Sequence, residues 1–163
     1  MQRIHWGLWV LPLLLAAGAA GASSDREVAA LLERDRPPPG VVFEIVSGDA
    51  RALEWAVPRV SGYAERLRAR FPALPIAVVT HGNEQFALQS DAQQSFIDLH
   101  RRVQELSTRE NVPVHICGTY AGMRGVAPEA FPKYVDVAPS GPAQIRGYRE
   151  LGYVLVRVTP GAR

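Results

Sequence analysis

The chain has 163 residues, with 18 Lys and Arg against 16 Asp and Glu and a formal net charge of +2, and this length favours a single domain. Its arginine runs are short and have acidic neighbours, which argues against a basic stripe of the kind that binds nucleic acid. The only cysteine is Cys117, so an internal disulfide and a Cys-x-x-Cys redox pair are excluded as well.

The first 22 residues have the pattern of a secretory signal peptide. A short basic start precedes the uncharged apolar stretch 6–20, and small residues at 20–22 suit a cleavage site before Ser23. The apolar stretch is shorter than the ~20 residues that a membrane-spanning helix needs. We therefore expect a periplasmic or secreted protein with no membrane segment after cleavage; an uncleaved membrane anchor is the alternative.

Residues 23–40 are expected to form an N-terminal helix followed by a proline-rich linker. Apolar residues at helical spacing share one face of the segment 23–36, and the sequence Pro-Pro-Pro-Gly at 37–40 then breaks the chain. This helix either packs on the main domain or serves as a mobile arm. The main domain is expected to span 41–163.

From residue 41 onward, apolar strands alternate with helical stretches. Strands are expected at 41–46, 75–80, 112–117, 134–137 and 153–158, and helices at 50–71, 91–108 and 140–150. Pro58 is expected to kink or delay its helix, and Ser90 or Asp91 to cap the next one. Near-continuous apolar strands alternating with helices favour an α/β fold with a mostly parallel sheet of about five strands, covered on both faces.

In sheets of this kind, ligands and catalytic groups gather beyond the carboxyl ends of the strands. Three segments, 47–49, 80–84 and 117–120, fall at such ends. The residues there and nearby that are candidates for contact with a ligand are Gly48, Gly82, Asn83, Gly118, Thr119 and Arg124.

Cys117 is the first candidate for chemistry, because it ends a predicted strand and glycines follow it. A short helix beginning near Thr119 would point its amides at the sulfur, and Arg124 would add positive charge. Either effect favours the thiolate, which is the nucleophilic form. The alternative is a buried, inert thiol, since free cysteine is among the most buried residue types.

His81 is the second candidate, because it follows a neighbouring strand and could act as a base or contact a ligand. The alternative is a histidine that only satisfies backbone groups in a turn. His115 lies on the same strand face as Cys117 and is interpreted as an interior or interface residue. The histidines and the cysteine lack zinc-ligand spacing, and no dinucleotide or phosphate-loop fingerprint is present. We therefore predict neither a metal nor a cofactor.

The loop from Val114-His115-Ile116-Cys117 to Met123-Arg124-Gly125-Val126 resembles the cysteine loop of the DsrE/TusD sulfur-relay proteins, in which a strand ends in a cysteine and Arg-Gly-Val follows seven residues later. The chain from 41 to 158 is similar to the wider DsrE/DsrF-like family. This resemblance implies a flavodoxin-like three-layer sandwich, assembled into trimers or hexamers. For the relay members it implies a cysteine that accepts a persulfide, here Cys117.

The leading hypothesis is therefore an exported sulfur-handling protein in which Cys117 carries sulfane sulfur between donor and acceptor proteins. A lone thiol suits this role, because a neighbouring cysteine would release the sulfur as a disulfide formed. The relay proteins that the loop resembles work in the cytoplasm, whereas this chain is expected to be exported. The alternative is a non-catalytic module that binds a small ligand or supports assembly and has an inert cysteine. An enzyme with His81 as its base is a third possibility.

Overall fold

The computed structural model describes residues 23–160, so the expected leader at 1–22 lies outside the described residues. The strands are β1 (Val41–Ile45), β2 (Ile76–Thr80), β3 (Val114–Cys117), β4 (Asp136–Ala138) and β5 (Val154–Arg157). The helices are α1 (Ser24–Leu32), α2 (Leu53–Arg70), α3 (Ile97–Thr108), α4 (Gly118–Met123) and α5 (Gly141–Glu150). Three short 3₁₀ helices complete the described part: η1 (Asn83–Leu88), η2 (Ser90–Ala92) and η3 (Pro128–Ala130).

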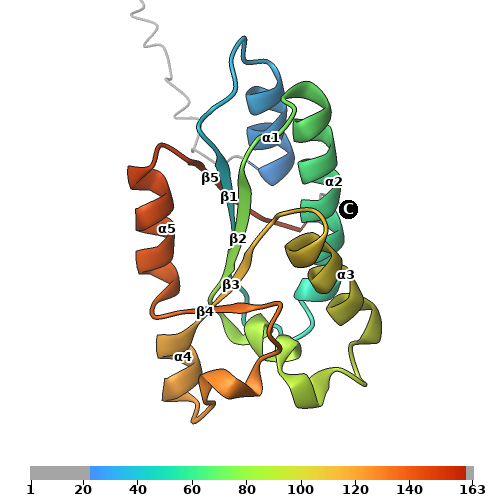
Figure 1. The fold of residues 1–163 in the computed structure, drawn as a ribbon, viewed down its shortest axis with the longest axis vertical. Coiled ribbons are helices and arrows are strands. Elements are labelled where there is room, and N and C mark those ends of the chain that lie inside the picture. Colours follow the sequence, from blue (N-terminus) through green and yellow to red (C-terminus); the bar gives the residue numbers. More distant parts are fainter. Residues whose placement is uncertain (1–22, 161–163) are drawn as a thin grey trace, which may run out of the picture.

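The five strands form one sheet in the order β4-β3-β2-β1-β5, and every neighbouring pair is parallel. The chain moves outward from β1 to β4, and α5 then returns it across the sheet to place β5 on the other side of β1 (Figure 1). The predicted α/β fold with a parallel five-stranded sheet is confirmed. All carboxyl strand ends consequently lie at one edge of the sheet, which we call the carboxyl edge.

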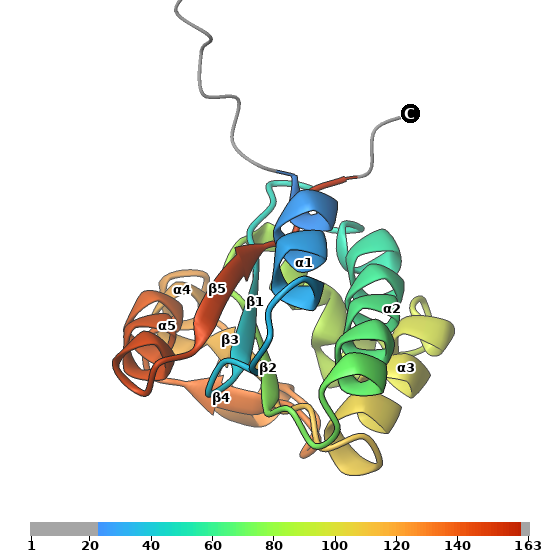
Figure 2. The ribbon, with the colours of Figure 1, turned by 90° about the horizontal axis from the view of Figure 1, so that it is seen from above.

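Helices cover both faces of the sheet, which gives three layers (Figure 2). Helices α1, α2 and α3 lie on one face, and α5 and α4 lie on the other, the α5 face. The larger core cluster includes residues of α1, α2 and α3. On the α5 face, by contrast, the buried cluster consists of Val42, Ala77, Val79 and Ile145. The thinner apolar layer on that face leaves space for polar side chains near the carboxyl edge.

Helix α1 packs on the main domain. Val28 and Leu31 belong to the larger core cluster, and the Ser24 hydroxyl lies 3.0 Å from the Tyr63 hydroxyl of α2. Ser24 also pairs with Thr159 just after β5, at 3.3 Å between the two hydroxyl oxygens. Of the two expectations for this segment, the structure supports a packed helix.

The segment before α3 differs from the prediction. A helix beginning at 91 was expected, whereas α3 begins at Ile97 and no side chain caps it. Residues 83–92 fold mainly as η1 and η2, because Glu84 and Gln85 are fully buried and bond to strand ends. The predicted cap by Ser90 or Asp91 is therefore wrong.

Two further helix predictions have clear outcomes. Helix α2 continues through Pro58 instead of starting after it. Helix α5 spans Gly141–Glu150, close to the expected 140–150, and Ser140 caps it, since the Ser140 hydroxyl accepts the Ala143 N–H at 3.5 Å. No helix in the stretch 23–160 combines the length and apolar character needed to cross a membrane.

Candidate functional site

A row of polar side chains crosses the α5 face at the carboxyl edge. Glu44 of β1 is in register with Arg157 of β5. The β2–β3 register pairs Thr80 with Ile116. The next residue on each strand therefore brings His81 opposite Cys117. The sheet therefore aligns four chemically active side chains, from β5 across to β3.

Cys117 ends β3 and is the residue from which α4 begins. Its Sγ accepts the N–H of Tyr120 at 3.4 Å, as a capping side chain does. The short helix predicted after the cysteine is present and starts at Gly118. The residue is buried, with only 5% of its surface exposed.

Gln85 holds the backbone of the cysteine. Its Oε1 accepts the Cys117 N–H at 2.9 Å, and its Nε2 donates to the Cys117 carbonyl at 3.2 Å. Gln85 is fully buried, and its amide takes the place of a strand neighbour where the β2–β3 ladder has ended. The position of Cys117 is thus fixed from the side of η1.

Gly141, the first residue of α5, approaches both candidate side chains. A Cβ at this position would lie 2.6 Å from the His81 Cβ and 3.3 Å from the Cys117 Cβ. The first contact is closer than real Cβ atoms allow, so the packing requires glycine. Since one point lies so near both atoms, His81 and Cys117 are close neighbours beneath the start of α5.

Glu44 and Arg157 extend the row beyond His81. The Nε2 of His81 lies 2.9 Å from Glu44 Oε1, and Arg157 Nε donates to Glu44 Oε2 at 2.7 Å. The side chain of Glu44 is only 13% exposed. Burial raises the pKa of Glu44, but the hydrogen bonds from His81 and Arg157 outweigh it and hold the pKa below its ordinary value. Glu44 is therefore an ionised carboxylate that accepts the His81 Nε2–H.

The loops beside the row are held by a second buried carboxylate. Glu84 accepts the Ser47 N–H at 2.7 Å, the Gly82 N–H at 2.8 Å and the Thr80 hydroxyl. Asn83 joins the same two loops, because its Nδ2 donates to the Gly48 carbonyl at 3.2 Å. These contacts assign Glu84 and Asn83 to loop structure, and the predicted cleft residues Gly48 and Gly82 lie in the joined loops.

The remaining predicted residues lie around α4 and β3. The Thr119 hydroxyl donates to the Pro139 carbonyl at 2.6 Å, and Gly118 packs against the backbone of β4. The Arg124 guanidinium lies over the Phe86 ring, 5.8 Å from its centre, which differs from its predicted role beside the sulfur. The structure thus brings His81 and Cys117 together but directs Arg124 elsewhere.

His115 lies deeper on the α5 face. Its Nε2 is 2.8 Å from the Tyr148 hydroxyl, and Asp136 Oδ2 is 3.7 Å from its Nδ1. Burial lowers the pKa of His115 and outweighs the opposing effect of Asp136. This agrees with its interpretation as an interior residue.

Sequence reasoning did not assign Glu44, Gln85 or Arg157 to the site. A signal for Glu44 was present, since it is the only charged residue in the strand Val41–Ile45, and a charge in a buried strand needs a partner. No comparable signal marked Gln85, which looks like an ordinary polar residue of a connecting segment.

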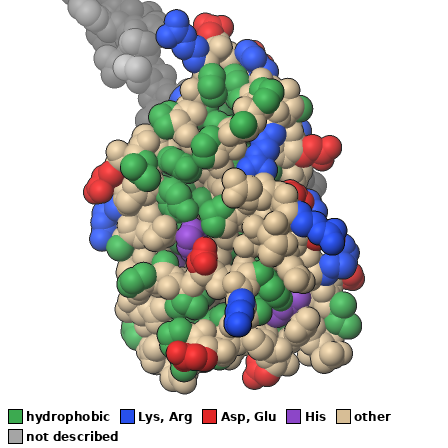
Figure 3. Space-filling model, viewed as in Figure 1, with side chains coloured by type: hydrophobic (Ala, Val, Ile, Leu, Met, Phe, Trp, Pro, Cys, Tyr) green, Lys and Arg blue, Asp and Glu red, His purple; other side chains and the backbone are tan. Residues whose placement is uncertain are grey.

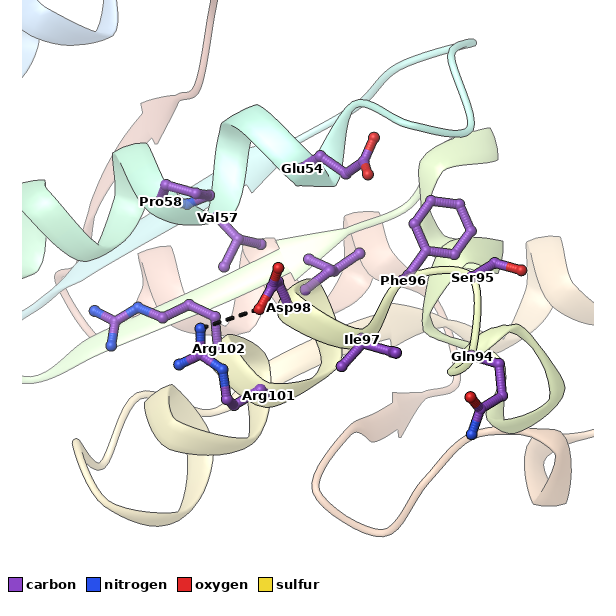
Figure 4. A pocket seen from close by; sticks show the side chains of 11 residues that line it. Glu54, Val57, Pro58, Gln94, Ser95, Phe96, Ile97, Asp98, Arg101 and Arg102 are labelled. Carbon is purple, nitrogen blue, oxygen red and sulfur yellow. Dashed lines mark hydrogen bonds and ion pairs between the residues drawn. The ribbon is translucent and has the colours of Figure 1, made fainter.

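A cavity of about 540 Å³ lies elsewhere, between α2 and the start of α3. Figure 4 shows its side chains, with an ion pair between Arg101 and Asp98 at 3.3 Å. Apolar groups such as Val57 and Phe96 also line it. It lies on the face opposite α5, and neither His81 nor Cys117 lines it. We therefore place the candidate site at the carboxyl edge, where the ionisable groups converge.

Basic and acidic side chains are interspersed on the face that Figure 3 shows. The large exposed apolar side chains of the described residues belong to separate segments: Val46, Ile97, Met123 and Leu151. Among residues 23–160, no group of three or more His, Cys, Asp or Glu side chains is placed to hold a metal ion.

No protein-family model matches the sequence, and no curated protein matches it either. The solved structures with a similar fold include the following two. MTH1491 from Methanobacterium thermoautotrophicum, described as a protein of unknown function, is 24% identical, with a TM-score of 0.58 over 72% of this chain and 96% of that one. The ychN protein from E. coli is 12% identical, with a TM-score of 0.50 over 72% of this chain and 98% of that one. At these identities the likeness establishes the fold, a flavodoxin-like α/β sandwich.

Proposed function

We propose that the protein is an exported carrier of sulfane sulfur and that Cys117 is the acceptor. The observation that carries the proposal is the setting of the thiol: Sγ lies at the carboxyl edge, accepts the Tyr120 N–H at 3.4 Å and has His81 as its neighbour. The resemblance of the loop 114–126 to sulfur-relay proteins supports the same chemistry.

In the proposed step, the Cys117 thiolate attacks the outer sulfur of a persulfide R–S–S–H. A bond forms between Sγ and that sulfur, and the bond between the two donor sulfurs breaks. The donor leaves as the thiolate R–S⁻ with the electron pair of the broken bond. A thiol acceptor later removes the sulfur by the same exchange, so the protein ends unchanged. Because Cys117 is the only cysteine, no second thiol in the chain can discharge the sulfur early.

The small exposed fraction of Cys117 suits a small donor. Inorganic polysulfide or a low-molecular-weight persulfide needs little surface to reach the sulfur, whereas a partner protein has to insert a segment beneath α5. A small donor is therefore the probe with which to test the proposal.

The test is incubation of the purified, reduced protein with polysulfide, followed by intact-protein mass spectrometry. We expect a gain of one or more sulfur atoms, which dithiothreitol reverses and which the Cys117→Ser variant does not show. An unchanged mass for the wild-type protein, under conditions in which a small free thiol takes up sulfur, would rule out the carrier role.

The burial of Cys117 favours a second candidate, a non-catalytic module that binds a small ligand at the carboxyl edge. Under that function the thiol is a packing group. Labelling with a maleimide distinguishes the two: a carrier thiol reacts in the native protein, whereas a packing thiol reacts only after denaturant unfolds the chain.

Export and self-assembly belong to the same proposal. The pattern of residues 1–22 supports export, and the resemblance to the DsrE/DsrF-like family supports a trimer or hexamer. N-terminal sequencing of the protein recovered from its native compartment checks the first, with Ser23 as the expected first residue. Light scattering checks the second, and a monomer would contradict it.

A further inference from the structure

The row on the α5 face contains a potential nucleophile, Cys117, a potential base, His81, and a carboxylate, Glu44, that binds this base. We propose that Glu44 is a positioning residue that holds His81 as the base for the Cys117 thiol. The inference rests on the proposed function only for the identity of the sulfur donor. The pairing of Glu44, His81 and Cys117 rests on geometry alone.

The carboxylate is itself held in place. The Nε of Arg157 donates to Oε2 of Glu44 at 2.7 Å, and the Nε2 of His81 lies 2.9 Å from Oε1, the other oxygen. A carboxylate bound on both oxygens and mostly buried has little freedom to rotate, so the imidazole that it binds is oriented too. The lowered pKa of Glu44 is consistent with a permanent acceptor.

This contact selects one tautomer of the histidine. With Nε2–H donated to Glu44, the lone pair of the neutral imidazole is on Nδ1. No hydrogen bond to Nδ1 of His81 occurs within the described residues. The ring is thus able to take up a proton at Nδ1 while its other nitrogen remains engaged.

Cys117 lies beside His81 on the same face of the sheet. His81 and Cys117 are opposite each other in the extended register of β2 and β3, and Gly141 packs against both Cβ atoms. The groups that face His81 are Glu44 from β1, Cys117 from β3 and the uncharged start of α5, with Arg157 acting through Glu44. No other charged side chain of the described residues bonds to this histidine.

The proton balance of sulfur transfer then follows. The thiol proton of Cys117 passes to Nδ1 of His81 as Sγ attacks the donor. Glu44 stabilises the imidazolium that results. The imidazolium returns the proton to the departing thiolate, so that a thiol and a persulfide yield a new persulfide and a new thiol, with no oxidant needed.

The experiment measures the rate of Cys117 alkylation by iodoacetamide as a function of pH. We expect Glu44→Gln and His81→Gln each to slow alkylation near neutral pH by on the order of 100-fold, the lower end of what a positioned base contributes. Both variants should also change the shape of the pH profile. The double variant should be no slower than His81→Gln alone, since Glu44 acts through His81.

Asp136→Asn is the matched control, because it removes the carboxylate beside the other histidine of the same face, His115. It should leave the alkylation profile unchanged. Urea denaturation of each variant measures folding separately, so a rate change in a folded protein reports on the site.

A Glu44→Gln profile that superimposes on that of the wild type would overturn the inference, and so would additive effects in the double variant. Alkylation needs no sulfur donor. If polysulfide leaves the wild-type mass unchanged while Glu44→Gln still alters alkylation, the carrier function fails and the positioning role stands.

Discussion

Two glycines determine how closely the backbone packs at the carboxyl edge. Gly82 lies against the loop after β1, where a Cβ would be 2.3 Å from Glu84 Oε2 and 2.5 Å from the Ser47 carbonyl oxygen. Gly141 lies against His81 and Cys117 in the same manner. A methyl group at either position requires movement of atoms that take part in the site or in its supporting loops.

Gly82→Ala is therefore expected to reduce the free energy of unfolding by about 1–3 kcal/mol, the usual cost of overpacking. Gly62→Ala is the matched control: Gly62 lies within α2, and a Cβ there meets no atom within 4 Å. The control should raise the free energy of unfolding by about 0.5–1 kcal/mol, because alanine favours helix. Urea denaturation measures both changes, and equal effects would contradict the packing argument.

The sequence predicts where the thiol and its histidine lie in the sheet but does not identify their supporting residues. Cys117 and His81 are recognisable because each follows a β-branched strand and precedes a glycine. The Glu44–Arg157 contact joins residues 113 positions apart, and it exists only because β5 returns to pair with β1. Strand order of this kind is a tertiary property that local pattern does not contain.

At the scale of elements, the 3₁₀ helix η1 connects the parts of the site. Three successive residues reach three different elements: Glu84 bonds to the loop after β1, Gln85 bonds to Cys117 at the end of β3, and Phe86 packs on Tyr120 of α4 at 5.6 Å between ring centres. After η1 the chain forms η2 and a turn, and α3 begins six residues later than predicted.

Helix α1 is the element whose role the sequence left open. Leu31 is 2% exposed within the shared core, so Leu31→Ala should lower the free energy of unfolding by about 2–5 kcal/mol. Leu151→Ala makes the same chemical change at a residue that is 68% exposed, and it should alter stability by no more than about 0.5 kcal/mol. A small effect of Leu31→Ala would mean that α1 is not part of the folded unit in solution.

At the scale of the molecule, the two faces of the sheet differ in character. The face under α1, α2 and α3 holds most of the apolar core, whereas the α5 face combines a small apolar cluster with buried ionisable groups. Two ionisable groups of the α5 face, His115 and Glu44, have shifted pKa values and make stability depend on pH. The composition does not predict this difference between the two faces, because the charged residues of both faces are interleaved along the sequence.

Acid is expected to destabilise the protein in two stages. Burial holds the pKa of His115 below the ordinary 6.5, so the unfolded chain takes up a proton first and the free energy of unfolding begins to fall as pH drops below that value. The lowered pKa of Glu44 gives stability that is present above the ordinary carboxyl range and is lost as pH falls through it.

Urea denaturation over a series of pH values checks both stages. His115→Gln should remove the decline that starts near pH 6.5, and Glu44→Gln should flatten the decline at lower pH. A wild-type stability that rises on acidification would show that other groups outweigh these two.

The pairing of Ser24 with Thr159 brings the two ends of the described chain within hydrogen-bond distance, at 3.3 Å between the hydroxyl oxygens. The described chain therefore begins and ends at the same place in the fold. A short peptide linker between residues 23 and 160 would therefore not have to cross the domain. Joining these two ends would lower the conformational entropy of the unfolded chain while leaving the row at the carboxyl edge unchanged.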